Sequence, residues 1–242
     1  MMEVVVIAAF IALGLMALGR LLPNSALGRW RSQRWFAWVV AGVLLVKLTE
    51  DVLGQETAAG DEAVLRWIHE TAPATWHGAA ILVTDTAAFL SVCITALVVG
   101  ALLVWRRRRR EAVALVLTPA IAGAVIYLFK GGINRTRPAL WDTDLYWGSS
   151  FPSGHTLAAA ALATALGLLA SRLESRPARI AVRASLALWV AAVAFSRMYL
   201  GVHWPTDVAA AACAGALVAI GVHAALLHLG ATRRSRQIPS PP

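Results

Sequence analysis

Two histidines and an aspartate have the types and spacing of a nucleophilic site. His203 and Asp207 lie one helical turn apart, so the carboxylate can accept a hydrogen bond from one ring nitrogen while the other acts as a nucleophile. His155 comes from a different segment and could protonate a leaving oxygen and then activate water. These three residues suit a phosphohistidine mechanism, provided that cations hold the phosphoryl oxygens.

Three basic side chains and one turn lie where they could bind that phosphate. Lys130 and Arg197 stand at the ends of apolar segments, and Arg137 follows Lys130 in the stretch KGGINRTRP. They supply one point charge and two planar donors, which suit tetrahedral phosphate oxygens. Ser153 and Gly154 precede another apolar segment, where unpaired backbone N–H groups at a helix start can cradle an anion. Metal-ligand spacing and a glycine-rich nucleotide loop are both missing from the sequence, so we expect neither a metal nor a cofactor.

The elements that carry these residues are predicted to span a membrane. The chain has 242 residues, of which 59% are apolar and 14% charged, and a mean hydropathy of +0.66, values that exclude an ordinary soluble domain, a disordered chain and a fibrous repeat. We therefore expect an all-α, polytopic membrane helix bundle. The predicted spans are Val4–Leu22, Trp35–Val52, Ala79–Trp105, Ala112–Phe129, Thr156–Ala170, Ile180–Phe195 and Asp207–Leu229.

Charge assigns each end of this bundle to one side of the membrane. Most of the 22 lysines and arginines fall on alternate connections, and most acidic residues fall on the others. The positive-inside rule makes the arginine-rich side cytoplasmic, with the C-terminus inside and the candidate site outside. The net charge of +9 is then explained by topology, so we expect no nucleic-acid partner. The basic connections contain Arg20, Arg29, Arg31 and Arg34; Arg106 to Arg110; Arg172, Arg176, Arg179 and Arg183; and Arg233, Arg234 and Arg236.

Three regions follow from this pattern. Residues 1–34 are predicted to form an extra N-terminal membrane helix and a basic cytoplasmic loop, residues 35–230 the main membrane domain, and residues 231–242 a basic, proline-rich tail. The first span lacks the basic start and the small-residue cleavage site of a signal peptide, so we expect it to be retained. Asp61–Glu70 is predicted to be a short amphipathic helix on the outer surface, with Asp61 near its N-cap. It could guide lipid tails or pack over the bundle.

At this point the motifs support a resemblance. Lys130-x6-Arg137-Pro138, Pro152-Ser153-Gly154-His155 and Ser196-Arg197-x5-His203-x3-Asp207 are similar to the motifs of the type 2 phosphatidic acid phosphatase superfamily of integral-membrane lipid phosphatases. The resemblance covers about residues 79–229 and implies a six-helix core with an extracytoplasmic site that works without a divalent metal. It also implies His203 as nucleophile, Asp207 as its orienting group and His155 as acid and base. The implied phosphate ligands are Lys130, Arg137, Ser153, Gly154 and Arg197.

The expected function is hydrolysis of a lipid phosphate or diphosphate at the outer face of the bacterial inner (plasma) membrane. The first specific expectation is undecaprenyl diphosphate phosphatase, and the alternatives are a phosphatidylglycerophosphate or phosphatidate phosphatase and a lipid phosphotransferase with the same site. A vanadium haloperoxidase is disfavoured by the membrane spans, and a passive lipid transporter would leave the two histidines unexplained. Arg135 lies beside the site and could hold a second phosphate or contact headgroups. The sequence does not predict an oligomeric state.

Overall fold

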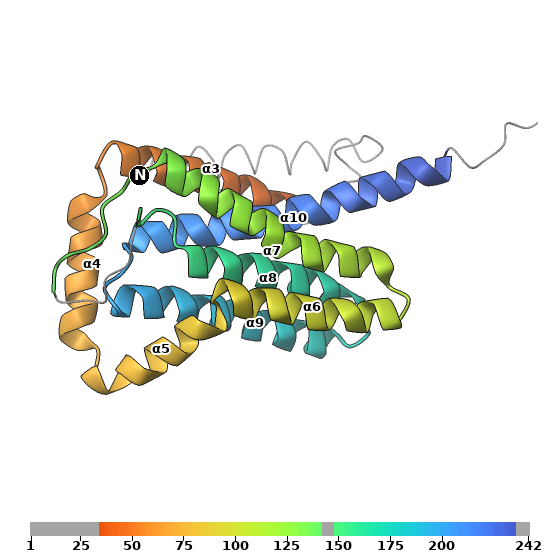
Figure 1. Cartoon of the computed structure of the whole chain (residues 1–242), viewed down its shortest axis with the longest axis horizontal. Coiled ribbons are helices and arrows are strands. Elements are labelled where there is room, and N and C mark those ends of the chain that lie inside the picture. Colours follow the sequence, from red (N-terminus) through yellow and green to blue (C-terminus); the bar gives the residue numbers. More distant parts are fainter. Residues whose placement is uncertain (1–33, 142–147, 236–242) are drawn as a thin grey trace, which may run out of the picture.

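The computed structural model describes residues 34–141 and 148–235, and all regular structure within these ranges is helical. This confirms the predicted all-α class. The predicted first span, Val4–Leu22, lies outside the described residues. With the labels of Figure 1, the helices are α3 (Arg34–Leu53), α4 (Ala58–Thr71), α5 (His77–Thr86), α6 (Phe89–Trp105), α7 (Arg109–Gly132), α8 (Gly154–Leu169), α9 (Arg176–Tyr199) and α10 (Pro205–Ser235), with short 3-10 turns η1 (Ala74–Trp76) and η2 (Ala170–Arg172).

The long helices run side by side along the length of the molecule, and α4 lies across one end of them (Figure 1). Four described helical segments are long and apolar enough to cross a membrane: 109–132, 154–172, 176–199 and 205–226. Helix α3 packs against α10 but does not meet the same test. Its last turns carry Lys47, Glu50 and Asp51, with the Lys47 ammonium 2.7 Å from the Asp51 carboxylate.

The predicted span Ala79–Trp105 is wrong as a single continuous helix. The chain breaks between α5 and α6, and the two segments, which together pass the spanning test, are bent by 51°. Side chains at the break occupy carbonyl groups that a continuous helix would use. The Thr86 hydroxyl donates to the Val83 carbonyl at 2.6 Å, and the Ser91 hydroxyl donates to the Asp85 carbonyl at 2.8 Å.

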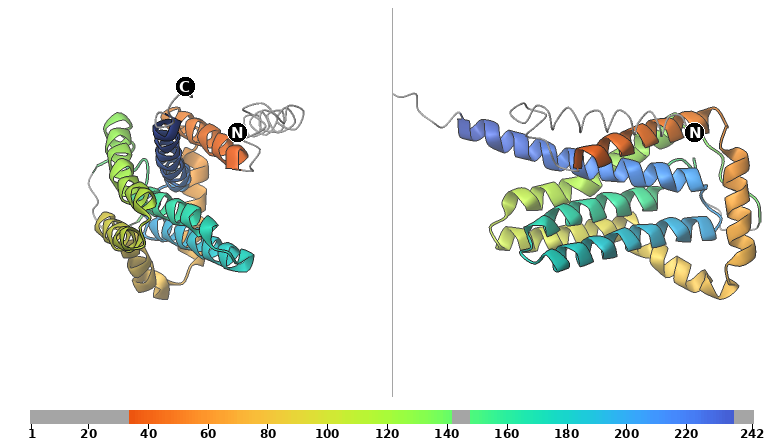
Figure 2. Two further views of the ribbon diagram at one scale, coloured as in Figure 1. Left: turned by 90° about the vertical axis from the view of Figure 1, so that its right-hand side faces the viewer. Right: turned by 180° about the vertical axis from the view of Figure 1, so that it is seen from behind.

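Helix α8 forms the centre of the bundle. It is packed between α7, α9 and α10, and its residues from Thr156 to Ala163 are all buried. Small side chains allow this close packing, as in membrane bundles generally. A Cβ added at Gly215 of α10 would overlap the Leu157 carbonyl oxygen and lie 2.9 Å from the Cβ of Ala160, so this crossing requires glycine. The arrangement of α8 and α10 inside the bundle is visible in the end view of Figure 2.

The outer surface of the bundle is strongly apolar. Large hydrophobic side chains on α6 and α7 are exposed, including Leu90 and Leu128, each at 70%. Such a continuous apolar exterior is unfavourable in water but is expected for helices surrounded by lipid. It supports the prediction of an integral membrane protein.

Helix α4 confirms the predicted amphipathic segment but places its residues differently. The helix begins at Ala58 after an N-cap at Thr57, so Asp61 lies within the first turn and not at the cap. The face that α4 buries consists of Asp61, Leu65 and Ile68, whereas Trp67 is 63% exposed. A carboxylate in the first turn of α4 is therefore buried in the contact between α4 and the bundle.

Candidate active site

The candidate residues gather at the end of the bundle that α4 covers. Because neighbouring helices run in opposite directions, α7 and α9 end there while α8 and α10 begin there (Figure 1). This arrangement brings the three motifs together, although they are separated by many residues along the chain. The connections that carry the arginine clusters, between α6 and α7 and between α8 and α9, lie at the opposite end.

A cavity of about 570 Å³ lies at this end. Its polar part contains six of the eight predicted site residues, and its other lining residues form an apolar wall contributed by the α5–α6 break, α6 and α7. The polar lining consists of Lys130, Arg137, Gly154, His155, Arg197 and His203. The apolar lining consists of Ala87, Phe89, Ala120, Gly123 and Ile126. A phosphate and an attached hydrocarbon chain would find complementary surroundings in the two parts.

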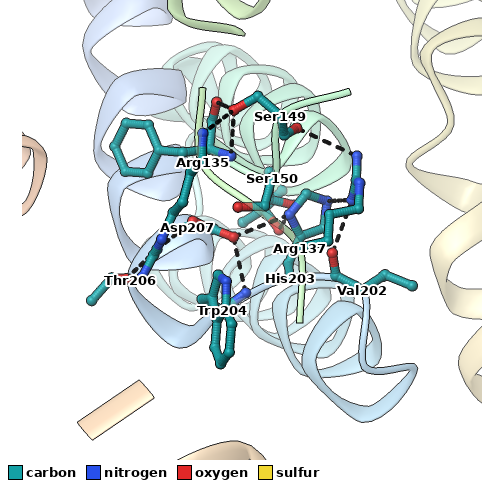
Figure 3. Close-up of polar contacts among 12 residues, drawn as sticks. Arg135, Arg137, Ser149, Ser150, Val202, His203, Trp204, Thr206 and Asp207 are labelled. Atoms are coloured by element: carbon teal, nitrogen blue, oxygen red, sulfur yellow. Dashed lines mark hydrogen bonds and ion pairs between the residues drawn. The ribbon is translucent and has the colours of Figure 1, made fainter. Parts of the chain in front are cut away.

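His203 is placed between an acid and a cation, as Figure 3 shows. Its Nδ1 lies 3.4 Å from Oδ2 of Asp207, and its Nε2 lies 3.4 Å from a guanidinium nitrogen of Arg137. The distance to Asp207 is longer than an ordinary hydrogen bond, as is common in catalytic sites without substrate. Burial lowers the pKa of His203 to about 4, while Asp207 acts in the opposite direction. This lowered pKa favours a neutral imidazole near pH 7, with Nε2 on the side of Arg137.

Arg137 is held by backbone carbonyl groups of the surrounding loops. One of its guanidinium nitrogens donates to the Val202 carbonyl at 2.9 Å, and the other donates to the Ser149 carbonyl at 3.4 Å. The loop that carries Arg137 is held in turn through the backbone carbonyl of Thr136. This carbonyl accepts hydrogen bonds from the Ser150 hydroxyl and from the Trp204 indole N–H. These contacts fix the guanidinium beside Nε2 of His203 before any ligand binds.

Arg197 is the largest fully buried side chain, with 1% of its surface exposed. One guanidinium nitrogen donates to the Thr84 hydroxyl at 3.0 Å, and the neighbouring Ser196 hydroxyl donates to the same oxygen at 3.2 Å. Thr84 is near the end of α5, so the break after α5 also provides support for a candidate phosphate ligand. Sequence analysis did not identify Thr84, because a threonine inside an apolar segment gives no distinctive signal.

The turn before α8 only partly matches its prediction. Gly154 lines the cavity, but Ser153 is fully buried behind it. The Ser153 backbone N–H donates to the Asp207 carbonyl at 3.3 Å, and its hydroxyl accepts a hydrogen bond from Thr156 at 3.1 Å. In this arrangement Ser153 ties α8 to α10, and the first two residues of α8, Gly154 and His155, line the cavity.

Arg135 and Asp61 form an unpredicted extension of the site. Arg135 does not line the cavity. Its guanidinium bonds Asp207 Oδ1 on one side and Asp61 Oδ2 on the other, each at 2.6 Å, and it lies over the Trp204 ring. It is therefore already committed to two carboxylates, which removes the expectation that it holds a second phosphate. Sequence analysis placed Asp61 on a surface helix, and only the folded chain brings it to Arg135.

A second cavity, of about 740 Å³, lies at the opposite end of the bundle. It is surrounded by the arginines of the α6–α7 connection and contains none of the predicted catalytic residues. Among the residues that the structure describes, no group of three or more His, Cys, Asp or Glu side chains could hold a metal ion.

Comparison with known proteins agrees with this geometry. A family model described as the PAP2 superfamily matches residues 111–230, which contain all eight predicted site residues. Residues 111–230 are a PAP2 superfamily domain. The PAP2 domain begins at α7, so α3 to α6 lie outside the matched part. Asp61, on α4, is therefore outside it, whereas its partner Arg135 is inside it.

Two named relatives resemble part of this chain. The decaprenylphosphoryl-5-phosphoribose phosphatase of Mycobacterium tuberculosis (strain CDC 1551 / Oshkosh) is 34% identical over 116 residues, which cover 46% of this chain and 59% of that protein. Phosphatidylglycerophosphatase B of Escherichia coli (strain K12) is 47% identical over 75 residues, which cover 30% of this chain and 28% of that protein. The matched part thus spans less than two thirds of either relative.

Solved structures share the fold over a longer stretch. A PAP2-type phosphatidylglycerolphosphate phosphatase from Bacillus subtilis superimposes with a TM-score of 0.69 at 20% identity, covering 84% of this chain and 100% of that chain. LpxE from Aquifex aeolicus superimposes with a TM-score of 0.51 at 23% identity, covering 69% and 93%. The helical membrane phosphatase fold therefore extends beyond the PAP2 domain to most of the described chain.

Proposed function

We propose that this chain is a metal-independent lipid phosphatase that hydrolyses undecaprenyl diphosphate to the monophosphate and inorganic phosphate. The observation that carries this proposal is the two-part cavity, in which cations and two histidines face an apolar wall. A soluble phosphate would need only the polar part. A substrate with a hydrocarbon chain uses both, and the apolar exterior of the bundle lets that chain stay in the bilayer.

In the first step, Nε2 of His203 attacks the terminal phosphorus. A nitrogen–phosphorus bond forms as the bond from phosphorus to the bridging oxygen breaks, and His155 donates a proton to that oxygen. The lipid monophosphate leaves. Arg137, Arg197 and Lys130 balance the charge on the oxygens of the transferring group, and Asp207 stabilises the positive charge that develops on the His203 ring.

In the second step, His155 is a base. It removes a proton from a water molecule, whose oxygen attacks the phosphorus as the nitrogen–phosphorus bond breaks. Inorganic phosphate leaves, His203 returns to its neutral form, and His155 is again protonated for the next cycle. The low pKa of His203 favours this cycle, because the ring starts neutral and nucleophilic.

The orientation in the membrane is part of the proposal. The cavity lies at the end of the bundle opposite the connections that carry Arg106 to Arg110 and Arg172 to Arg183. The positive-inside rule assigns those connections to the cytoplasm, so the site faces the outside of the inner membrane and the C-terminus lies inside. A substrate delivered in the outer leaflet would enter from the side of the bundle.

Two further substrate classes are supported by the named relatives. One is a polyprenyl-phosphoryl sugar phosphate, as the name of the mycobacterial relative states, and the other is phosphatidylglycerophosphate, as the name of the Escherichia coli relative states. Phosphatidate belongs to the second class. Transfer of the phosphoryl group to a lipid acceptor would use the same phosphohistidine and differ only in the second step.

The test is phosphate release by the full chain in detergent with EDTA present. Undecaprenyl diphosphate, decaprenylphosphoryl-5-phosphoribose, phosphatidylglycerophosphate and phosphatidate would be compared by kcat/KM. His203→Ala should abolish release, whereas His77→Ala, an exposed histidine outside the cavity, should leave it unchanged. Release that requires added metal, or that survives His203→Ala, would refute the mechanism. A phosphorylated lipid product without free phosphate would replace hydrolysis by transfer.

A further inference from the structure

Asp61 connects a helix outside the PAP2 domain to the catalytic pair. Its carboxylate is 3% exposed, and one oxygen accepts a hydrogen bond from the Thr206 backbone N–H at 3.0 Å. The other oxygen accepts from the Thr206 hydroxyl and from the Arg135 guanidinium, both at 2.6 Å. Thr206 directly precedes Asp207 at the start of α10, so Asp61 bonds the segment that positions the acid.

Arg135 extends this connection to Asp207 itself. One guanidinium nitrogen donates to Asp207 Oδ1 at 2.6 Å and to the Thr206 hydroxyl at 2.7 Å, while the other donates to Asp61. With Oδ1 held by Arg135, the second carboxylate oxygen of Asp207 accepts from the Trp204 N–H at 2.9 Å and faces Nδ1 of His203. Arg135 on one oxygen and the Trp204 N–H on the other therefore hold the Asp207 carboxylate in its orientation toward His203 (Figure 3).

The charges along this series alternate. Asp61 and Asp207 are acidic, and Arg135 lies between them with 13% of its side chain exposed. An Arg135 bonded to Asp207 alone would neutralise the one carboxylate that must stabilise a positive His203. Since Asp61 neutralises Arg135 in turn, the three groups together keep one net negative charge beside the imidazole, at short range in a poorly hydrated site.

We propose that Asp61 is a positioning residue for the proposed phosphohistidine reaction, which it influences through Arg135 and Asp207. This inference rests on the proposed function, because it concerns the positive charge that forms on His203. It makes α4 a part of the active site, although α4 lies outside the family-matched residues. Asp61 does not touch the substrate cavity.

The same contacts could serve only to dock α4 on the bundle, and the two roles predict different kinetics. A positioning role lowers kcat with little change in KM, because the charge on His203 develops in the chemical step. It also depends mainly on Arg135: without the guanidinium, Asp61 is connected to Asp207 only through its hydrogen bonds to Thr206. A docking role lowers stability and acts whether or not Arg135 is present.

The experiment is a double-mutant cycle in the full chain with undecaprenyl diphosphate as substrate. We expect Asp61→Asn to lower kcat by about tenfold or more, a fall like that caused by leaving one partner of a buried charged pair unmatched. In the Arg135→Gln background, Asp61→Asn should lower kcat much less than in wild type, because only the hydrogen bonds to Thr206 then connect Asp61 with Asp207. Glu62→Gln removes a charge next to Asp61 that bonds only Arg66 of the same helix in the described structure, and should have no effect.

Leu65→Ala serves as the docking control. Leu65 is fully buried on the same face of α4, so its truncation should lower the thermal midpoint in detergent without lowering kcat. The inference is overturned if Asp61→Asn matches wild type, if it lowers kcat equally in both Arg135 backgrounds, or if Leu65→Ala lowers kcat as much. Should the single variant not fold, comparison of Arg135→Gln with the double variant still decides. Activity in His203→Ala would instead refute the proposed nucleophile.

Discussion

Enlarging the side chain at Ala120 should show that the polar and apolar parts of the cavity have different roles in substrate binding. Ala120 is exposed on α7 and lines the apolar wall, so Ala120→Phe would place a ring where the proposed hydrocarbon chain lies. If the ring displaces about two methylene groups of the chain, the lost burial is about 1.6 kcal/mol at about 0.8 kcal/mol each. That corresponds to a roughly fifteen-fold fall in kcat/KM for a long-chain substrate.

The assay compares undecaprenyl diphosphate with a short-chain diphosphate of a few carbons, at the same detergent concentration. The short-chain substrate should be hydrolysed within about twofold of wild type, because the polar part of the cavity is unchanged. Ile121→Phe is the matched control: the neighbouring side chain is 40% exposed on the same helix but does not line the cavity.

Two results would refute this reasoning. An equal loss for long and short substrates would mean that the ring disturbs the phosphate site itself, and the apolar wall would have no role in chain binding. No loss for either substrate would mean that the hydrocarbon chain of the substrate does not lie against Ala120, and the assignment of the apolar wall to chain binding would be wrong.

Three other changes follow from the described contacts. Thr84→Val removes the hydroxyl that accepts from Arg197 and should lower kcat/KM by about tenfold, as expected for a buried hydrogen bond to a charged group. The thermal midpoint should fall as well, so kcat/KM is measured well below the midpoint of the variant, and an unchanged kcat/KM would contradict the role given to Thr84. Burial lowers the pKa of His203 to about 4, so between about pH 6.5 and 4 the unfolded chain binds a proton that the folded chain does not, and the folded state loses stability as the pH falls. The stability of His203→Gln should therefore depend less on pH across that range. An equal pH dependence in the variant and wild type would contradict the lowered pKa of His203. Gly215→Ala should lower the thermal midpoint markedly, because the added Cβ would overlap the backbone of α8; a midpoint equal to wild type would show that the two helices can separate at little cost.

Much of the site was predictable because its residues occupy short, spaced motifs at the ends of apolar segments. Once the spans and their alternating directions are assigned, Lys130, His155, Arg197 and His203 must lie at the same end of the bundle. The structure places all four around one cavity. The convergence of these residues could be predicted because each membrane span fixes the direction of the chain. Motifs at the span ends on the same side of the membrane must therefore lie near one another.

The break between α5 and α6 was not predictable from hydropathy. Residues 79–105 are predominantly apolar, with Asp85 as their one charged residue, so the pattern favours one helix. At the break, the hydroxyls of Thr86 and Ser91 bond carbonyl groups of the preceding segment. Serine and threonine also occur in unbroken membrane helices, and for that reason their presence alone does not indicate a bend.

The sequence by itself determined the class of fold and predicted the direction of the spans and the residues of a phosphate site, because hydropathy, charge distribution and local motifs are properties of nearby residues. Only the tertiary structure decided that Asp61, Arg135 and Asp207 form one buried series. Asp61 lies 74 residues from Arg135 in the chain, and nothing in its own neighbourhood distinguishes it from a solvated acid. A buried carboxylate acquires its partner only when the helix that carries it packs, since burial without that partner would be too costly to persist.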